Sequence, residues 1–249
     1  MIFRPKKKIF ILGNQKSGTS AIANLTAEAG GLSKTIDIPK LWPPYIQKLV
    51  KKEVNLSDVV RSNKKYFKSE LIKEPNLTFL FEELLRIYPN AEYAMVVRNP
   101  FGNIRSILNR YKLSGKIDAL NQEQIFKLGN HYNLFQAENW NLEQTDNPIE
   151  ALALRWNLAA SVFINYKDHV NISLIRYEDF TDSKSESIYA LCDLLNTAKR
   201  NDISKSTEIQ FQPKGDNSLS YLDFFGPTNF SLIKETCWPL AAEFDYGIE

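Results

Sequence analysis

The sequence has few of the residues that form cross-links or hold metals. Its 249 residues include two cysteines and two histidines. The cysteines, Cys192 and Cys237, stand far apart, and neither has another cysteine or a histidine at the spacing of metal ligands. We therefore expect no disulfide framework and no zinc or other metal site, and a reducing, cytoplasmic location.

Long apolar runs, repeats and low-complexity tracts are also missing. The lysines at 6–8 precede only four apolar residues, 9–12, a run much shorter than a signal peptide or a membrane span requires. No Gly/Ser-rich linker and no fixed-period repeat divides the chain. The sequence predicts a single domain over residues 1–249 without a transmembrane segment.

Charge of one sign does not dominate the composition. The chain has 31 basic and 29 acidic residues, a net charge of +2, with 43% hydrophobic and 12% aromatic residues. This balance is typical of an ordinary globular protein and argues against general binding of nucleic acid. Any anion must therefore be held by a local group of cations.

Short apolar runs alternate with segments of helical periodicity. The runs predict strands at residues 8–12, 70–72, 93–97 and 172–175. The periodic segments predict helices at residues 18–29, 77–88, 102–111, 149–165, 183–195 and 231–243. Alternation of this kind predicts an α/β fold of three layers, with a central parallel sheet flanked by helices. Residues 113–148 have no apolar run typical of a strand, and this predicts a helical insertion or lid.

A glycine-containing turn follows the first expected strand. Gly13 and Gly18 have the spacing of the phosphate-binding motif G-x-x-x-x-G-K-[ST], but Thr19 stands where that motif needs lysine. The cation stands inside the turn instead, at Lys16. Backbone N–H groups and the start of the next helix favour an anion here, without the usual magnesium-coupled arrangement. An ordinary turn between strand and helix is the alternative.

A second candidate anion site follows the third expected strand. Arg98 stands at the end of that strand, and Ser106 lies in the first two turns of the next helix, which Pro100 is suited to begin. The planar guanidinium matches a phosphate group, and a serine hydroxyl adds a hydrogen bond. Two anion sites on adjacent parallel strands would face the same edge of the sheet.

Together these segments resemble the sulfotransferase superfamily, which uses 3'-phosphoadenosine 5'-phosphosulfate (PAPS). Residues 16–20, Lys-Ser-Gly-Thr-Ser, resemble the 5'-phosphosulfate loop P-[KR]-S-G-T-[TS], and residues 98–106 resemble the 3'-phosphate motif. Residues 175–180 are similar to a strand-terminal Y-E-D segment near the adenosine, and residues 214–215 to a closing lysine-glycine pair. The resemblance implies a P-loop-like fold and cofactor binding by Gln15, Lys16, Ser17, Gly18, Thr19, Ser20, Arg98, Ser106, Tyr177, Lys214 and Gly215.

The sequence departs from this pattern in three places. Gln15 replaces the proline that usually precedes the loop lysine, and residues 213–215 keep only part of the closing arginine-lysine-glycine triplet. Ala21 stands where the aryl and steroid enzymes carry a tryptophan over the adenine. We expect Tyr177 or Phe211 to supply that aromatic contact.

The resemblance implies transfer of a sulfuryl group to an acceptor hydroxyl or amine, with 3'-phosphoadenosine 5'-phosphate (PAP) as the product. Lys16 would stabilise the leaving oxygen, and a base must accept the acceptor's proton. Residues 73–75 read Lys-Glu-Pro where the aryl and steroid enzymes carry lysine-x-histidine, so a carboxylate is expected as the base.

Asp37 and Glu74 are the two candidate bases. Asp37 lies beyond the loop, where the protein-tyrosine branch of the superfamily has its catalytic glutamate, and Glu74 ends the second expected strand. Structural roles remain open for both: Asp37 as a turn or cap residue, and Glu74 as an ion-pair partner that orients Lys73 or Arg98. His131 is a third candidate.

The acceptor is expected to be a small molecule, a carbohydrate or a lipid. Candidate pocket residues are Trp42, Tyr45, Tyr132, Trp140 and Trp156, although aromatic residues at helical spacing more often belong to a hydrophobic core. Two other functions stay open at this stage. One is a magnesium-dependent small-molecule kinase or nucleotide hydrolase, and the other is an inactive nucleotide-binding scaffold.

Overall fold

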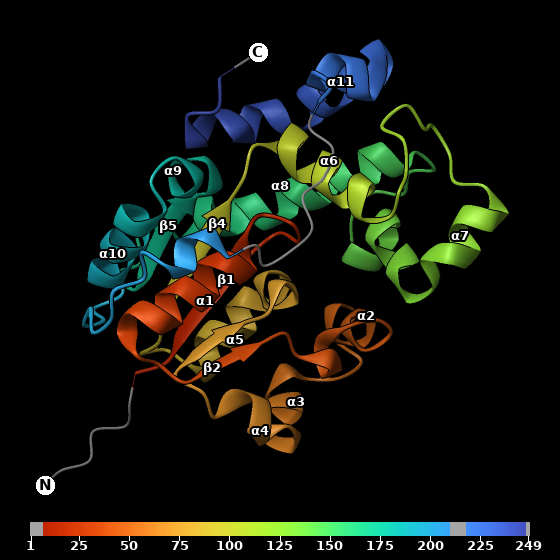
Figure 1. Cartoon of the computed structure of the whole chain (residues 1–249). Coiled ribbons are helices and arrows are strands. Elements are labelled where there is room, and N and C mark those ends of the chain that lie inside the picture. The colour runs from red at the N-terminus through yellow and green to blue at the C-terminus, as the bar shows by residue number, and fades with distance from the viewer. Residues whose placement is uncertain (1–6, 210–217, 248–249) are drawn as a thin grey trace, which may run out of the picture.

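The protein is built around one parallel β-sheet. The computed structural model describes residues 7–209 and 218–247 (Figure 1). Five strands pair in the order β2-β3-β1-β4-β5, and all four pairings are parallel. The strands are β1 (Ile9–Gly13), β2 (Lys34–Ile36), β3 (Leu71–Lys73), β4 (Glu92–Val97) and β5 (Ile172–Arg176). The predicted α/β fold with a central parallel sheet is confirmed.

Four of the five strands match the sequence predictions, and β2 was missed. The strand is three residues long and lies at the edge of the sheet, where Lys34 pairs with Leu71 and Ile36 with Lys73. None of its residues is buried. The sequence therefore has no apolar run at this place, because a short edge strand does not have to bury either of its faces.

Helices fill the connections between the strands. The α-helices are α1 (Thr19–Gly30), α2 (Tyr45–Val50), α3 (Leu56–Ser62), α4 (Lys64–Phe67), α5 (Phe81–Ile87), α6 (Pro100–Arg110), α7 (Gln122–Leu128), α8 (Pro148–Tyr166), α9 (Tyr177–Asp182), α10 (Lys184–Leu194) and α11 (Tyr221–Ala241). Short 3-10 helices are η1 (Pro39–Leu41), η2 (Pro75–Leu80), η3 (Gly129–Phe135), η4 (Ala137–Trp140), η5 (Ser206–Glu208) and η6 (Ala242–Phe244). The predicted helix at 77–88 begins as η2, and α11 begins well before residue 231.

Alternate residues of β1 face two separate cores. Phe10 and Leu12 belong to a core shared with α5, α6, α8 and α11, whereas Ile9 and Ile11 join a core formed with α1 and α10. Successive side chains of a strand point to opposite faces of the sheet, so a strand buried on both faces reads as a continuous apolar run. Figure 1 shows α1 and α10 together on one side of the sheet.

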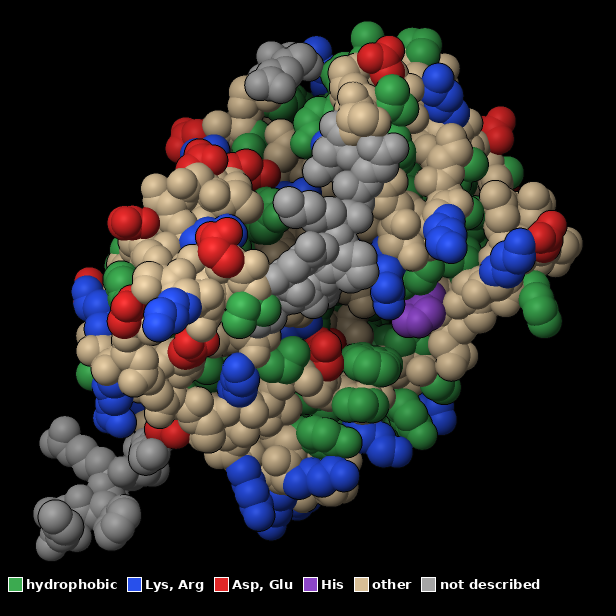
Figure 2. Space-filling view, in the orientation of Figure 1, with side chains coloured by type: hydrophobic (Ala, Val, Ile, Leu, Met, Phe, Trp, Pro, Cys, Tyr) green, Lys and Arg blue, Asp and Glu red, His purple; other side chains and the backbone are tan. Residues whose placement is uncertain are grey.

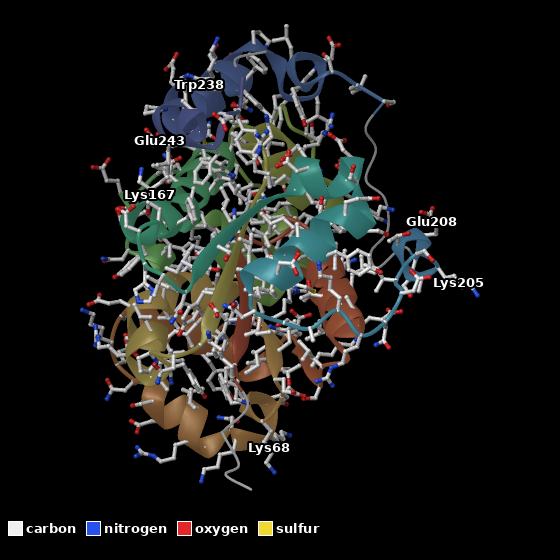
Figure 3. The ribbon with its side chains drawn as sticks, turned by 90° about the vertical axis from the view of Figure 1, so that its left-hand side faces the viewer. Lys68, Lys167, Lys205, Glu208, Trp238 and Glu243 are labelled. Atoms are coloured by element: carbon white, nitrogen blue, oxygen red, sulfur yellow. The ribbon has the colours of Figure 1, made fainter. Side chains whose placement is uncertain are left out.

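The covering helices are also joined at the surface. Lys167, at the end of α8, forms an ion pair of 3.9 Å with Glu243 in η6, as can be followed in Figure 3. Residues 113–148 contribute α7, η3 and η4, and Phe135 and Trp140 of this stretch enter the larger core. None of the helices in residues 7–209 and 218–247 has the length and apolar character needed to cross a membrane.

Candidate active site at the carboxyl edge of the sheet

Every strand of the sheet leads into one of the residues singled out from the sequence. Because all five strands run parallel, their carboxyl ends meet at one edge of the sheet, where α/β proteins bind ligands. The strands β2, β3, β1, β4 and β5 are followed in turn by Asp37, Glu74, the loop at residues 14–18, Arg98 and Tyr177. The prediction that β1 and β4 are neighbours is confirmed.

The loop at residues 14–18 turns sharply between β1 and α1. Lys16 and Gly18 both have left-handed backbone conformations, with φ of 65° and 86°. Ser17 is buried, and its N–H donates to the carbonyl of Asn14 at 3.3 Å. Turns of this kind direct backbone N–H groups into one concavity and favour an anion.

Gly18 is required by a close contact as well as by its conformation. A Cβ atom at this position would lie 2.4 Å from Cδ2 of Tyr177, the first residue of α9. The tyrosine ring therefore packs directly on the backbone of the loop. A side chain of any size at residue 18 would have to displace that ring.

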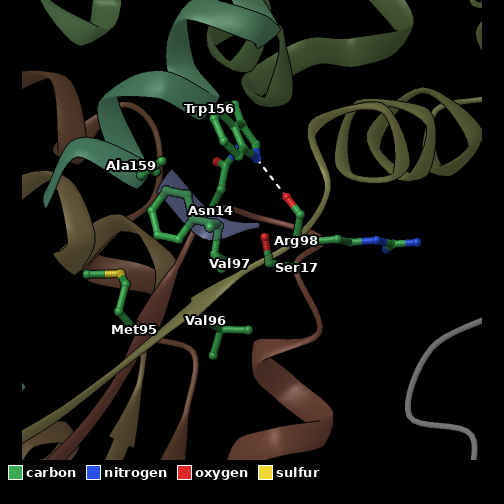
Figure 4. Close-up of a pocket in the computed structure, with 10 residues that line it drawn as sticks. Asn14, Ser17, Met95, Val96, Val97, Arg98, Trp156 and Ala159 are labelled. Atoms are coloured by element: carbon green, nitrogen blue, oxygen red, sulfur yellow. Dashed lines mark hydrogen bonds between the residues drawn. The ribbon is translucent and has the colours of Figure 1, made fainter. Parts of the chain in front are cut away.

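Arg98 connects the two predicted anion motifs. Its Nη1 donates to the carbonyl oxygen of Lys16 at 2.9 Å, and its guanidinium lies 4.3 Å from the centre of the Tyr177 ring. The carbonyl of Arg98 accepts a hydrogen bond of 2.9 Å from Nε1 of Trp156, and the arginine side chain extends away from that indole (Figure 4). The Lys16 loop and the Arg98 side chain thus form one site.

Two asparagines that were not singled out from the sequence hold the loop. Asn103 of α6 donates from Nδ2 to the Gln15 carbonyl at 2.8 Å and to Oγ of Ser17 at 3.0 Å. Its Oδ1 accepts from Nδ2 of Asn14 at 2.9 Å, and both asparagine side chains are buried. Each asparagine lies inside one of the two anion motifs, which is the signal that could have identified them.

A third missed residue, Arg155, lies beneath the loop. This fully buried arginine of α8 donates from Nη1 to Oδ1 of Asn14. Its guanidinium lies 4.6 and 4.4 Å from the ring centres of Phe79 and Trp140, which pack against each other at 4.5 Å. Burial lowers the pKa of Arg155 to about 9. The apolar pattern of residues 149–165 concealed this residue, because its neighbours on the helix are core residues.

Lys16 lies in a group of like charges. Burial lowers the pKa of its ammonium group to about 8, and the charges of Arg110, Arg98 and Lys73 act in the same direction. Cations brought together in this way create a strong local attraction for an anion. The small net charge of the whole chain gives no indication of it.

The two candidate bases have different surroundings. Asp37 retains 39% exposure of its side chain, and its Oδ1 accepts from Nζ of Lys73 at 2.6 Å. Its backbone N–H donates to the Lys73 carbonyl at 2.8 Å, so Asp37 is fixed to the end of β3. An exposed carboxylate held in position by one lysine can still reach a ligand.

Glu74, by contrast, is fully buried and holds three donors. Its Oε2 accepts from the N–H of Ile38 at 2.8 Å and from Nε1 of Trp42 at 3.1 Å, and its Oε1 accepts from the N–H of Asn76 at 3.0 Å. Burial raises the pKa of Glu74 to about 7 with a contribution from the charge of Asp37, although the two backbone hydrogen bonds and the charge of Lys73 oppose the shift. Among the described residues, Glu74 forms no ion pair with Lys73 or Arg98; Lys73 pairs with Asp37, although its charge still acts on Glu74.

The remaining predicted residues are spread around this site. Thr19 and Ser20 form the first turn of α1, and Ser106 lies half-buried on α6. Lys214, Gly215 and Phe211 lie outside the described residues.

The aromatic candidates for an acceptor pocket divide into two groups. Trp140 and Trp156 are buried in the larger core, and Tyr132 packs against it. Trp156 also lines a small pocket together with Asn14, Ser17 and Arg98 (Figure 4). Trp42 and Tyr45 are 42% and 44% exposed. His131 packs beside Tyr111, and burial lowers its pKa, with the charge of Arg110 adding to the shift.

Comparison with solved structures places this geometry in a known fold. The sulfotransferase domain from the curacin biosynthetic pathway superposes with a TM-score of 0.56 and 15% identity, over 99% of this chain and 100% of that domain. A Mycobacterium avium sulfotransferase gives 0.58 and 14%, over 99% and 78% of the two chains. A mouse sulfotransferase complexed with PAP gives 0.54 and 16%, over 98% and 90%. No family model and no curated protein matches the sequence. The chain has the fold of the sulfotransferases.

Proposed function

We propose that this protein is a sulfotransferase that takes a sulfuryl group from PAPS and gives it to an acceptor hydroxyl or amine. The observation that carries the proposal is the contact of the Arg98 guanidinium with the Lys16 carbonyl. This contact joins the loop at residues 16–20 and the segment at residues 98–106 into one site. In the proposal, the loop binds the 5'-phosphosulfate of the donor and the segment binds its 3'-phosphate. The fold shared with known sulfotransferases supports the same conclusion.

The described residues fit such a donor. The N–H groups of Gly18, Thr19 and Ser20 lie at the start of α1, where a helix leaves its first donors without partners inside the helix. Lys16 adds a cation beside them, and Arg98 and Ser106 suit the 3'-phosphate. When bound, PAPS supplies an activated sulfuryl group, and PAP is released after transfer. In this proposal the cofactor residues remain Gln15, Lys16, Ser17, Gly18, Thr19, Ser20, Arg98, Ser106, Tyr177, Lys214 and Gly215.

Lys16 supplies the electrostatic part of the reaction. Its pKa of about 8 leaves the ammonium group mainly protonated at neutral pH. A protonated Lys16 stabilises negative charge that develops on the oxygen bridging phosphate and sulfur, and the helix start stabilises the neighbouring oxygens. Lys73 lies close enough to add to the same field, since its charge acts on Lys16.

We assign the base to Asp37. The carboxylate is partly exposed, and its ion pair with Lys73 fixes its position without closing it off. Glu74 has the pKa better suited to accepting a proton at neutral pH, yet both of its oxygens already accept hydrogen bonds. A base must reach within about 3 Å of the proton that it accepts. The role of Glu74 in this proposal is to hold η1 and η2 on the ends of the strands.

The donor half of the proposal is tested by calorimetric titration with PAP and with adenosine 5'-phosphate, which lacks the 3'-phosphate. PAP should bind at least tenfold more tightly, because hydrogen bonds to a charged group contribute about 1.5–3 kcal/mol. Ser106→Ala should reduce that preference, whereas Ser161→Ala on α8 should leave it unchanged. Equal binding of the two nucleotides by the wild-type protein would contradict the roles of Arg98 and Ser106.

Turnover separates the three candidate functions. Cell extract incubated with the protein and labelled PAPS should contain a product heavier by one SO3 group, and a chelator should not prevent its formation. Magnesium-dependent release of phosphate from a nucleoside triphosphate, abolished by chelator, would identify a kinase or hydrolase instead. A scaffold predicts that Lys16→Ala changes nucleotide affinity while no product forms with either protein.

A further inference from the structure

Positive charge is concentrated on the segment from η1 to the end of α4. Residues 39–68 contain eight of the chain's 31 basic residues and two of its 29 acidic residues. The rest of the chain is therefore net negative, although the whole chain carries +2. All eight basic side chains of this segment are exposed: Lys40, Lys48, Lys51, Lys52, Arg61, Lys64, Lys65 and Lys68.

The same segment contains a groove between α2 and α3. Its volume is about 360 Å³, within the range of pockets that hold small molecules. None of the described residues that line it is acidic. The rest of the wall is mainly apolar or basic, with Ser62 and Asn63 as its polar residues; the others are Tyr45, Leu49, Val54, Val59, Lys40 and Lys48.

The lysines of the groove have no acidic partner among the described residues. Nζ of Lys40 lies 4.9 Å from the centre of the Tyr45 ring, and neither Lys40 nor Lys48 forms an ion pair within that part of the chain. The nearest ion pair along the segment joins Arg61 to Asp58, which do not line the groove. Figure 2 shows hydrophobic side chains over α2 with Lys and Arg side chains around them.

The wall of the groove is carried by the chain segment that follows the proposed base. η1, which carries Lys40, begins two residues after Asp37, and Trp42 after η1 donates to the buried Glu74 at 3.1 Å. The carbonyl of Leu41 accepts from Nδ2 of Asn76 at 2.8 Å, which ties η1 to η2, the 3-10 helix that follows β3. The proposed base and the first lysine of the groove wall therefore lie three residues apart on one anchored segment.

We propose that this groove binds an anionic amphiphile, a molecule with an apolar body and a carboxylate or similar group, and that this molecule is the acceptor. The apolar lining suits the body, and Lys40 and Lys48 suit the charge. A carbohydrate would leave the apolar wall unused, and a neutral lipid would leave the lysines unused.

The acceptor role rests on the proposed function. The acceptor's hydroxyl oxygen forms a bond to sulfur as the bond from that sulfur to the 5'-phosphate oxygen of PAPS breaks. The hydroxyl proton passes to the Asp37 carboxylate, and PAP leaves. The groove thus assigns a substrate class to the acceptor side of the same site.

Binding is measured first, on the full chain without any donor. The fluorescent probe 11-(dansylamino)undecanoate should bind at least about fivefold more tightly than its methyl ester, since each partly exposed ion pair contributes modestly. Lys40→Gln with Lys48→Gln should remove that preference without weakening binding of the ester. Val54→Asp should weaken both probes, because it places a charge in the apolar wall.

A matched control separates the effect of the two groove lysines from that of the positive charge of the whole segment. Lys64→Gln with Lys65→Gln removes the same charge from α4, outside the groove, and should leave the preference for the carboxylate intact. Circular dichroism melting curves should establish that each variant is folded. Equal binding of acid and ester would overturn the proposal. So would an equal loss in the control, or binding only to vesicles of anionic lipid, which indicates a membrane surface.

The acceptor role needs a second measurement. Supplied with PAPS, the protein should sulfate 12-hydroxydodecanoate with a higher kcat/KM than the methyl ester, and Lys40→Gln with Lys48→Gln should abolish the difference. PAP affinity should be the same in all these variants. Probe binding without PAP binding would reject the proposed function and keep the groove as a ligand site. PAP binding with unselective or absent probe binding would reject the groove alone.

Discussion

Lys16 combines a left-handed backbone conformation with an ammonium group whose pKa is about 8. An anion bound beside it raises that pKa again, so binding takes up a proton around pH 8. We therefore expect the dissociation constant of PAP to increase as the pH rises from 7 to 9, by at most about tenfold per unit above the pKa.

Lys16→Arg is the control for this pH dependence, because a guanidinium keeps its charge throughout this range. Isothermal titration at half-unit pH steps should give a nearly flat profile for the variant. If the variant shows the same slope as the wild-type protein, another group is responsible for the pH dependence.

Gly18→Ala tests the contact between the loop and Tyr177. The added Cβ meets the ring at 2.4 Å and the backbone keeps φ of 86°, so we expect the free energy of unfolding to fall by about 1–3 kcal/mol. Gly31 isolates the effect of backbone conformation, because it is also left-handed, with φ of 60° and ψ of 40°, while the nearest atom to an added Cβ is Cδ of the flexible Arg200 side chain at 3.3 Å. Urea denaturation should show a smaller loss for Gly31→Ala. If the free energy of unfolding falls equally in both variants, the contact with the Tyr177 ring does not contribute to the effect.

The assignment of the base is tested by neutral variants of the two carboxylates. Asp37→Asn should lower kcat about 10²–10⁴-fold and leave PAP affinity unchanged, since it removes a proton acceptor. Glu74→Gln should mainly lower the free energy of unfolding, because a side-chain amide cannot accept all three hydrogen bonds. The reverse pattern, a large loss of kcat in a stable Glu74→Gln protein, would make Glu74 the base.

At the scale of elements, α6 ties the end of β4 to the loop after β1. Asn99 caps the helix by accepting from the N–H groups of Phe101 and Gly102, and Pro100 begins it as predicted. Glu178 of α9 accepts from the Asn99 N–H at 3.1 Å and from the Tyr246 hydroxyl at 2.8 Å. The Y-E-D segment therefore has a structural partner on α6 and another near the end of the chain.

Asn103 on α6 allows the positioning role of this helix to be tested against a matched residue. Asn103 donates to Gln15 and Ser17, and Asn229 of α11 donates to the carbonyls of Gly115 and Ile117. Both asparagines are buried, so alanine at either site should cost about 1–3 kcal/mol of stability. Only Asn103→Ala should also weaken PAP binding in calorimetry. Equal PAP affinities for the two variants would contradict a positioning role for Asn103.

At the scale of the whole molecule, the sheet joins two cores, and the candidate site spans the ends of all its strands. A donor that binds there should stabilise the folded chain as a unit. At a PAP concentration of one hundred times Kd the expected gain is about 2.7 kcal/mol, which raises Tm by roughly 5–10 °C in a protein of this size. Differential scanning calorimetry with PAP, and with adenosine 5'-phosphate at the same concentration, measures this gain. An equal shift with both nucleotides would argue against recognition of the 3'-phosphate.

The sequence alone determined most of the sheet and the location of the donor motifs. Apolar runs identify β1, β3 and β4, because strands buried on both faces are rich in apolar residues, and the apolar residues of the partly buried strand β5 identify it as well. Motif spacing identifies the loop at Lys16 and the segment from Arg98, because a turn that binds anions needs glycine and a cation at particular places. Strand β2 escaped prediction, since an exposed edge strand of three residues carries no such pattern.

Only the tertiary structure decided how these residues act together. The sequence left Asp37 and Glu74 as equal candidates, and burial separated them: one is exposed beside Lys73, and the other is enclosed by three donors. The supports of the loop, Asn103 and Arg155, come from helices distant in the chain. Contacts of this kind depend on which segments the sheet brings together, and local periodicity carries no information about them.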